Sequence, residues 1–379
     1  MNKTFAPDRD ARRQEKPILL CFSHLRWDFV FQRPQHLMGR AARTHSVFFV
    51  EEAVHEPTAP HFRMRFEPSG VTVVTPVFDR HCNADHEQNL LVAALLDRLQ
   101  PTHLTFWYYT PMALRFTSGL PSDVTVYDCM DELSAFRFAP PELNALERDL
   151  MARADLVFTG GASLHAAKAH LHHNIHCYPS SVDTAHFNRA RRQMADPVDQ
   201  VPLAKPRIGY FGVIDERMDM GLVALAAASL PDVQFVMLGP IVKVDHAQLP
   251  RGANLHWLGK KDYADLPAYM ANWQGAWMPF ALNDATRFIS PTKTPEFLAA
   301  GLPVISTAIA DVVADWGHDG LVQIADASSI ADALRASLTQ AKSGLRDRVD
   351  ARLAAMSWDR TWQAMGVRMN AANRVPVPA

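Results

Sequence analysis

The sequence has few cysteines, almost no net charge and no long apolar run. Its 379 residues include four cysteines without a C-x-x-C pair, so neither a disulfide framework nor a zinc site is expected. Lys and Arg number 38 against 40 Asp and Glu, and this net charge of −2 argues against a surface for nucleic acid. No run reaches the roughly 18 apolar residues of a membrane span.

The amino-terminal segment lacks the apolar core of a signal peptide. Residues 1–16 are polar and rich in Asp and Arg, and we interpret them as a loose tail. We therefore expect a cytoplasmic protein, either soluble or peripheral at the inner face of the membrane. No G-x-G-x-x-G motif follows the first strand-like run, Ile18–Ser23, which disfavours a dinucleotide-dependent dehydrogenase.

Apolar strand-like runs and helix-like segments alternate along the chain. Leu104–Tyr108 and Val124–Cys129 are two such runs, and Glu87–Leu99 is a helix-like segment before them. This alternation predicts a parallel sheet with helices on both faces. Because the runs are apolar throughout rather than alternating, they are typical of strands buried on both sides.

A polar stretch with three prolines, residues 188–206, interrupts this pattern, and the alternation restarts at Arg207–Val213. We predict an α/β protein with two Rossmann-like, doubly wound parallel-sheet domains that face a cleft. The predicted domains are residues 17–190 and residues 205–355. A terminal helix within residues 356–379 is expected to pack back on the first domain.

Ligands of open parallel sheets bind outside the carboxyl ends of the strands, so two such domains make a cleft between facing strand ends. This architecture fits a nucleotide-sugar glycosyltransferase, a sugar-nucleotide epimerase, a periplasmic-type binding protein or a dehydrogenase. The missing signal peptide weighs against the periplasmic protein. A non-catalytic sugar-nucleotide-binding protein remains an alternative.

The segment Phe280–Thr307 contains the most informative pattern, a strand, a loop, a short helix and another strand. Ser290 is a candidate N-cap with Pro291 at the first helical position, and such a helix start suits a diphosphate. A cation in the first turn, Lys293, opposes the helix dipole and is better explained by a bound anion. Glu296 lies on nearly the same face and is a candidate for ribose hydroxyls; the alternative is a surface Lys–Glu pair.

Three further residues of the second half belong to this prediction. Gly212 follows a strand and lets the backbone approach a ligand, and Arg217 supplies a second phosphate contact. Thr292, next to Lys293, is the remaining donor candidate. Gly301 is expected to end the short helix.

The first half supplies a candidate base. The run Val124–Phe136 ends in the acids Asp128, Asp131 and Glu132, and a strand-end carboxylate facing the donor is placed to take a proton from an acceptor hydroxyl. The alternative is that Asp131 caps the following helix. The D-x-x-D spacing has no further ligand cluster beside it, so no essential metal is expected.

Polar residues also gather after the first strand, around Trp27 and Phe31. His24, Arg26 and Arg33 are the candidates there for contact with the acceptor or, in the case of Arg33, with the diphosphate. The alternative is a helix start whose arginines are solvated.

Four segments resemble GT-B glycosyltransferases. Ser290–Thr307 is similar to their donor segment S-x-x-K-x-x-E-Y-x-A-A-G-x-P-V-I, and Ser181–Phe187 to their G-V-D-x-x-x-F loop. Ser23–Leu37 resembles a bacterial subgroup that includes teichuronic-acid-type members. Val126–Ser134 resembles V-Y-x-x-S-D-G-L-S of the xanthan-type glucuronosyltransferases, which are inverting, and places Asp131 on their catalytic base.

The resemblance implies a metal-independent hexosyltransferase of the GT-B fold without a cofactor. Its donor would be a nucleotide sugar, most simply a UDP sugar, and its acceptor a cell-surface glycan or a lipid-linked sugar. Lys293 would contact the diphosphate and Glu296 the ribose. Many retaining relatives carry a second Glu where this chain has Phe288, so inversion is favoured and retention is the alternative; Asp284 is a candidate to reach the sugar.

Overall fold

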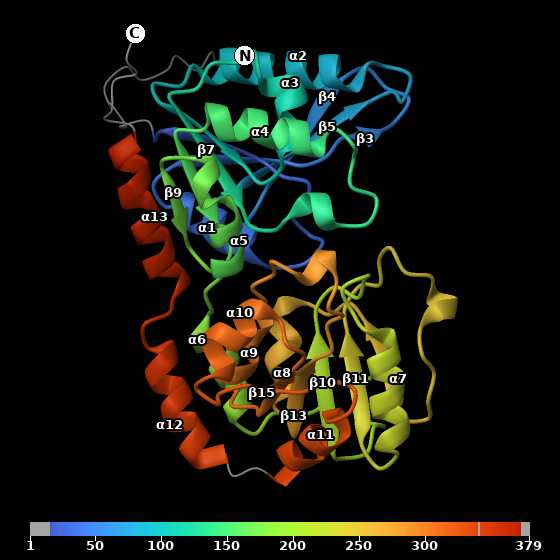
Figure 1. The fold of residues 1–379 in the computed structure, drawn as a ribbon. Coiled ribbons are helices and arrows are strands. Elements are labelled where there is room, and N and C mark those ends of the chain that lie inside the picture. Colours follow the sequence, from blue (N-terminus) through green and yellow to red (C-terminus); the bar gives the residue numbers. More distant parts are fainter. Residues whose placement is uncertain (1–15, 340–341, 373–379) are drawn as a thin grey trace, which may run out of the picture.

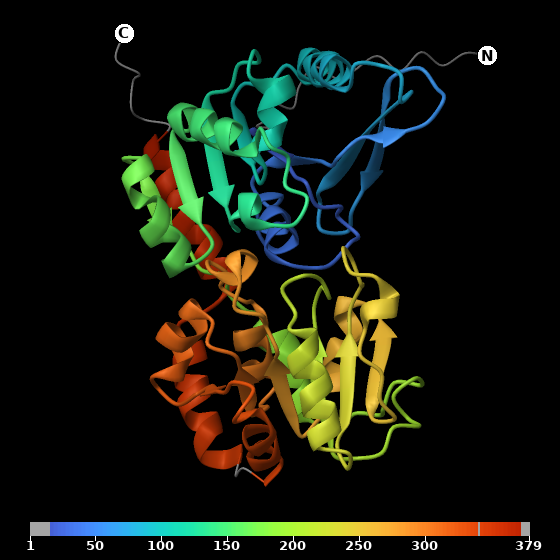
Figure 2. The ribbon, with the colours of Figure 1, turned by 45° about the vertical axis from the view of Figure 1, so that its right-hand side comes forward.

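The computed structural model describes residues 16–339 and 342–372 and shows two α/β domains, one above the other (Figure 1). The expected tail, residues 1–16, lies outside the described residues except for Lys16. In each domain the strands are mainly parallel and their carboxyl ends point toward the other domain. Figure 2 shows this facing arrangement from a second side. The predicted fold class is therefore confirmed.

The first domain contains a nine-stranded sheet in the order β3-β5-β2-β1-β6-β7-β8-β9, with β4 added antiparallel to β5. Its strands are β1 (Ile18–Phe22), β2 (Ser46–Val50), β3 (Val54–His55), β4 (His61–Phe66), β5 (Thr72–Phe78), β6 (Leu104–Tyr108), β7 (Val124–Cys129), β8 (Leu156–Thr159) and β9 (Ile175–Cys177). Its helices are α1 (Arg33–Ala41), α2 (Ala84–Leu99), α3 (Leu114–Thr117), α4 (Leu143–Arg153) and α5 (Ala162–Lys168). The central strands β1 and β6 are buried along their whole length, as continuous apolar runs require.

The second domain contains a six-stranded sheet in the order β12-β11-β10-β13-β14-β15. Its strands are β10 (Arg207–Phe211), β11 (Gln234–Leu238), β12 (Leu255–Gly259), β13 (Gly275–Met278), β14 (Val304–Ser306) and β15 (Gln323–Ile324). Its helices are α6 (Thr184–Phe187), α7 (Met220–Ser229), α8 (Leu266–Met270), α9 (Lys293–Ala299), α10 (Ala310–Val312), α11 (Ile330–Thr339) and α12 (Lys342–Leu353). The paired strands are all parallel, so each crossover carries the chain back across the sheet and leaves a loop at the cleft.

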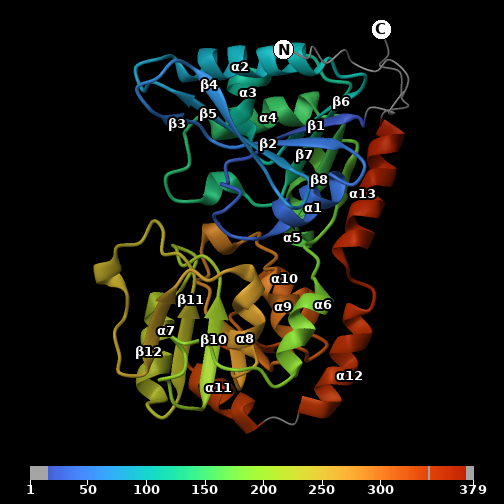
Figure 3. The ribbon, with the colours of Figure 1, turned by 180° about the vertical axis from the view of Figure 1, so that it is seen from behind.

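The last helix, α13 (Trp358–Ala372), leaves the second domain and lies along the first (Figure 3). Trp358, Met365 and Met369 are buried in the same cluster as residues of α1 and of the sheet. The Trp358 ring stacks on His36 with centroids 4.5 Å apart. Together α1 and α13 cover one face of the first sheet, and α2 to α5 cover the other.

Some elements carried no clear sequence signal. Strand β4 alternates little and is almost wholly exposed, with Phe66 80% exposed, so neither pattern nor burial marks it. Helix α5 begins directly after Gly160–Gly161, which by itself suggests a turn. Helix α12 has no apolar period to identify it, although Val349 and Leu353 are buried.

Candidate active site

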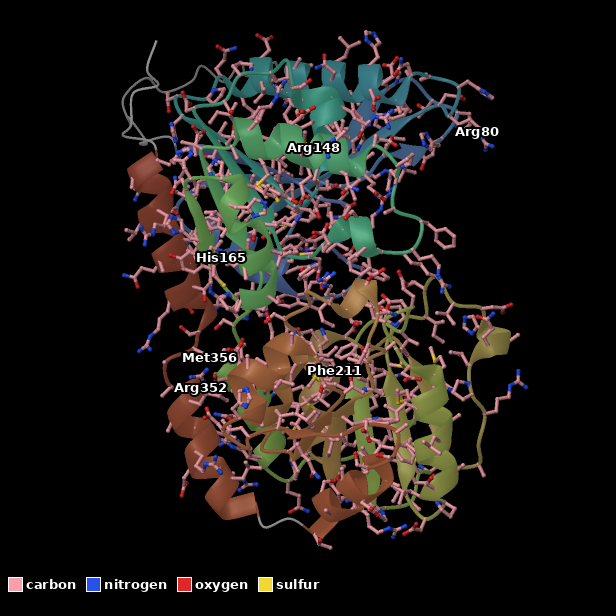
Figure 4. All side chains as sticks on the ribbon, viewed as in Figure 1. Arg80, Arg148, His165, Phe211, Arg352 and Met356 are labelled. Atoms are coloured by element: carbon pink, nitrogen blue, oxygen red, sulfur yellow. The ribbon has the colours of Figure 1, made fainter. Side chains whose placement is uncertain are left out.

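A cavity of about 570 Å³ lies between the two domains, at the carboxyl ends of both sheets. The second domain contributes the loops after β10, β11, β12 and β13, and the first contributes the loops after β1 and β7. Phe211, the last residue of β10, lies at this end of the second sheet (Figure 4). The predicted site residues in its wall are Arg33, Asp131, Gly212, Arg217, Ser290, Thr292 and Lys293.

Asp131 lies where this cavity adjoins a second one of about 770 Å³, and it lines both. Burial raises the pKa of its carboxyl to about 6, although the positive charges of Arg217 and Lys293 act in the opposite direction. Among the described residues, nothing donates a hydrogen bond to this carboxylate; only the backbone oxygen of Asp131 accepts one, from Cys129 Sγ. The next 3₁₀ turn, Leu133–Ala135, has Glu132 at its N-cap position and no side-chain cap, so Asp131 does not cap it.

Arg217 is held in place by its neighbour two residues earlier. Its Nε and Nη2 donate to both carboxylate oxygens of Asp215 over 2.6–3.1 Å, and Asp215 is 4% exposed. A bidentate pair of this kind fixes a planar guanidinium more tightly than a single contact does. Arg217 lines both cavities and carries a positive charge to the boundary between them.

Helix α9 begins at Lys293, not at Pro291 as predicted, and Ser290 is not its N-cap. The reason is Pro295, which in a helix starting at Pro291 would stand opposite the carbonyl of Pro291, where its ring clashes and its missing N–H breaks the ladder. Starting at Lys293 places Pro295 in the first turn, where no N–H is needed. Gly301 ends the helix with φ +77°, so that part of the prediction is confirmed.

Lys293 is half-buried, and loss of contact with water lowers the pKa of its ammonium group. Its Nζ donates to Thr292 Oγ1 over 3.0 Å, and it forms no ion pair within the described chain, so the alternative of a surface Lys–Glu pair is not what the structure shows. Glu296 is 5% exposed and lies outside the cavity wall. Burial raises the pKa of Glu296 to about 7, and its Oε2 has no hydrogen-bond partner in the described residues.

Gly212 has φ +147° and lies against Lys293. A Cβ placed there would come within 2.7 Å of Tyr210 Oη and 3.0 Å of Lys293 Cε. Its carbonyl oxygen would lie 1.7 Å from a Cβ on Gly239, so the two loops touch through their backbones. Glycine is sterically required at both positions, because a side chain at either one would clash with neighbouring residues.

The other predicted residues lie in different surroundings. Arg33 is 2% exposed and its guanidinium is used within the first domain, on Asp128 and on the carbonyl of Tyr178. Arg26 pairs with Glu51 at 3.3 Å and lines neither cavity. Asp284 is exposed in a surface 3₁₀ turn and also lines neither cavity.

His24 lines the second cavity. Burial lowers the pKa of its imidazole to about 4, so the ring is neutral at pH 7, and its Nδ1 has no partner in the described residues. Among the described residues, no group of three or more His, Cys, Asp and Glu side chains is arranged to hold a metal ion. Within the same residues, no helix is both long and apolar enough to cross a membrane.

A segment of the first domain, residues 136–140, lines the second cavity and contacts the second domain; we call it the strap. The backbone N–H of Arg137 donates to Glu216 Oε1 of the second domain over 2.9 Å. The ring of Phe136 lies between two cations of that domain, 5.2 Å from Arg217 Cζ and 5.0 Å from Lys243 Nζ. Sequence reasoning missed this strap because its residues carry no motif or period.

The sequence and the structure are both similar to those of known proteins. Residues 205–340 match the family described as Glycosyl transferases group 1. A sucrose-phosphate synthase from Thermosynechococcus elongatus has a TM-score of 0.69 at 14% identity, over 94% of this chain and 99% of that one. A trehalose-6-phosphate protein from E. coli, solved with bound UDP-2-fluoro glucose, has a TM-score of 0.69 at 12% identity, over 96% and 100%. The chain has the GT-B fold of glycosyltransferases.

A curated relative is similar in sequence as well. The TuaH protein of Bacillus subtilis (strain 168), which is named as a teichuronic acid biosynthesis glycosyltransferase, is 26% identical over 254 residues. The alignment covers 62% of this chain and 62% of that protein, so the chain spans less than two thirds of its relative. The resemblance to a teichuronic-acid-type GT-B protein is therefore supported by sequence, and the fold by structure.

In this GT-B fold, two contacts at the cleft join the domains. Tyr263 of the second domain stacks on Phe31 of the first, with ring centroids 4.4 Å apart, and its buried hydroxyl has no partner in the described residues. The Nζ of Lys260 donates to the carbonyl of Asp28 across the same boundary. Both contacts join residues far apart in the chain, and no local pattern predicts them.

Proposed function

We propose that the protein transfers a sugar from a nucleoside-diphosphate sugar, with UDP as the favoured nucleotide, to a hydroxyl group of an acceptor. The observation that carries this proposal is Asp131, a carboxylate with a pKa of about 6 at the boundary of two cavities and opposite Arg217 and Lys293. A base and two cations in this arrangement suit attack by an acceptor oxygen and departure of a diphosphate.

In the proposed reaction, Asp131 takes the proton of the acceptor hydroxyl while its oxygen attacks the anomeric carbon. The bond from that carbon to the diphosphate oxygen breaks, and the diphosphate leaves with the electron pair. Lys293 and Arg217 stabilise the charge that develops on it. Attack from the side opposite the leaving group inverts the configuration. Phe288 stands where retaining relatives carry a Glu, which supports inversion over retention.

The donor is assigned to the 570 Å³ cavity. We assign the diphosphate to Lys293, Thr292 and Ser290 in the wall of this cavity. Glu296 lies outside that wall, and its assignment to the ribose rests on the resemblance of Ser290–Thr307 to the donor segment and on its Oε2, which has no hydrogen-bond partner in the described residues. UDP is favoured because a structurally similar protein was solved with a UDP sugar. We propose that Lys293 and Arg217, and no essential metal, hold the diphosphate; full activity in EDTA would support this.

The acceptor is assigned to the 770 Å³ cavity, which is large enough for a sugar and part of a carrier. We propose a cell-surface glycan or a lipid-linked sugar as acceptor, following the named role of the Bacillus relative. His24, neutral at pH 7, is assigned to an acceptor hydroxyl. Two phenylalanines of the first domain, Phe66 and Phe138, are each 80% exposed and support contact with the cytoplasmic face of a membrane.

The proposal is tested with a panel of nucleotide sugars and their free nucleotides. We expect one UDP sugar to raise the melting temperature and to release UDP when an acceptor is added, and NMR of the product to show an inverted anomeric centre. A changed nucleotide sugar without acceptor would identify an epimerase. Retained configuration would remove Asp131 as the base, and failure of every nucleotide sugar to bind would overturn the proposed function.

A further inference from the structure

A buried carboxylate joins the two domains on the side of the cleft away from the strap. Asp311, in α10 of the second domain, is 3% exposed. Its Oδ2 accepts a hydrogen bond from the backbone N–H of Ala162 over 2.9 Å, and its Oδ1 accepts one from Ser163 over 3.0 Å. Both donors belong to the first turn of α5 in the first domain, and α5 and α10 lie beside one another in Figures 1 and 3.

The charge of Asp311 is balanced by these N–H groups. Asp311 forms no ion pair within the described residues, and the first turn of a helix is the end that carries partial positive charge. Hydrogen bonds to an ionised acceptor are stronger and more directional than neutral ones. The contact therefore sets both the separation and the orientation of the two domains at this point.

Two glycines at the start of α5 pack closely between Asp311 and the residue before Asp131. A Cβ on Gly161 would come within 2.3 Å of Asp311 Oδ2 and 2.7 Å of Ser290 Cβ, so the second domain fills the space where a side chain would be. A Cβ on Gly160 would come within 2.5 Å of the Met130 carbonyl oxygen and 2.9 Å of its Cα. The turn is thus packed between Asp311 on one side and the residue before Asp131 on the other.

We propose that Asp311 is a positioning residue for the transfer reaction, which sets the distance between Asp131 in the first domain and the Ser290–Lys293 loop in the second. This proposal rests on the proposed function. The path runs from Asp311 through the start of α5 to Gly160 and Met130, and each step is a hydrogen bond or a backbone contact. A displacement of about 1 Å between a base and its substrate costs about 100-fold in rate.

The test compares Asp311→Ala and Asp311→Asn with Asp319→Asn, an exposed acid of the same segment whose side chain makes no described contact with the first domain. We expect Asp311→Ala to lower kcat by about 100-fold while calorimetry shows an unchanged Kd for the donor. Hydrogen exchange at Ala162 and Ser163 should become faster in this variant, and Asp311→Asn, which keeps one acceptor oxygen, should fall in between. The Asp319→Asn protein should behave as wild type.

A second variant guards against loss of folding. Gly161→Ala acts from the first domain, because its methyl group would displace the same carboxylate; since that methyl group would also press on Ser290, we expect it to lower kcat and to weaken donor binding as well. Faster exchange at Ala162 and Ser163 with unchanged kcat would overturn the role of Asp311, and so would a loss of donor affinity at unchanged kcat. A wild-type protein that binds no nucleotide sugar would instead overturn the proposed function.

Discussion

Arg33 and Asp128 form a buried ion pair inside the first domain, with hydrogen bonds of 2.9–3.1 Å from Nε and Nη2 to the carboxylate. The remaining arm of the guanidinium, Nη1, donates to the carbonyl of Tyr178 over 2.7 Å. The pair therefore joins α1, β7 and the segment after β9. The sequence pattern places both residues at the cleft, but in the structure they stabilise the first domain. Asp131 is then the acid of the D-x-x-D motif that forms no ion pair within the described residues.

Removing Arg33 should destabilise the protein strongly. Arg33→Met leaves Asp128 buried without a partner, and we expect the free energy of unfolding to fall by about 3–5 kcal/mol in urea titrations. The double variant Arg33→Met/Asp128→Leu removes both charges and should recover most of the loss. A single variant as stable as wild type would show that the pair contributes little.

Replacing Asp131 should separate activity from stability. Asp131→Asn is expected to abolish transfer and to leave the donor Kd unchanged. Its folded-state pKa of about 6 exceeds the ordinary 3.8, so above pH 6 the folded state carries a charge that burial disfavours. Asn removes this charge, and the free energy of unfolding at pH 7.5 should rise by up to about 3 kcal/mol. Retained transfer activity would contradict the assignment of the base.

The rate of transfer should follow the ionisation of Asp131. Below pH 6 its carboxyl is protonated and cannot accept a proton, so kcat should fall about tenfold per pH unit there and level off above pH 7. The measurement uses saturating donor, because the pKa of Glu296 is about 7 and its ionisation is expected to alter donor affinity. A kcat that stays constant from pH 5 to pH 7.5 would exclude Asp131.

Replacing Lys293 should weaken donor binding, whereas replacing an exposed lysine elsewhere in its domain should not. Lys293→Ala removes a charged contact to the diphosphate, and we expect donor binding to weaken by about 1.5–3 kcal/mol, measured by calorimetry. Lys205→Ala is the matched control, since Lys205 is exposed, does not line the cavity, and its Nζ donates to Asn272 Oδ1. Equal donor affinity in both variants would remove Lys293 from the donor site.

The sequence predicted the architecture well because buried parallel strands are continuous apolar runs. It placed Asp131 and Gly212 at the cleft because each follows such a run, and Lys293 because a cation in the first turn of a helix opposes the helix dipole. It misplaced the start of α9, since Ser290 and Pro291 satisfy the local capping pattern while Pro295 excludes a helix that starts there about one turn later. Phe136 and Asp311 could not be found, because their partners lie on the other domain. Contacts of that kind depend on how two folded units meet.

The chain passes between the domains twice, once after β9 and again between α12 and α13, near Met356 and Arg352 (Figure 4). Two covalent connections between the same two domains allow rotation about the line that joins the connections and resist twisting or sliding of one domain against the other. Any opening of the cleft would then carry Asp131 and Lys293 apart along an arc, and closing would return them to the same register. The crossing that leads into α13 thus limits how the two domains can move relative to one another.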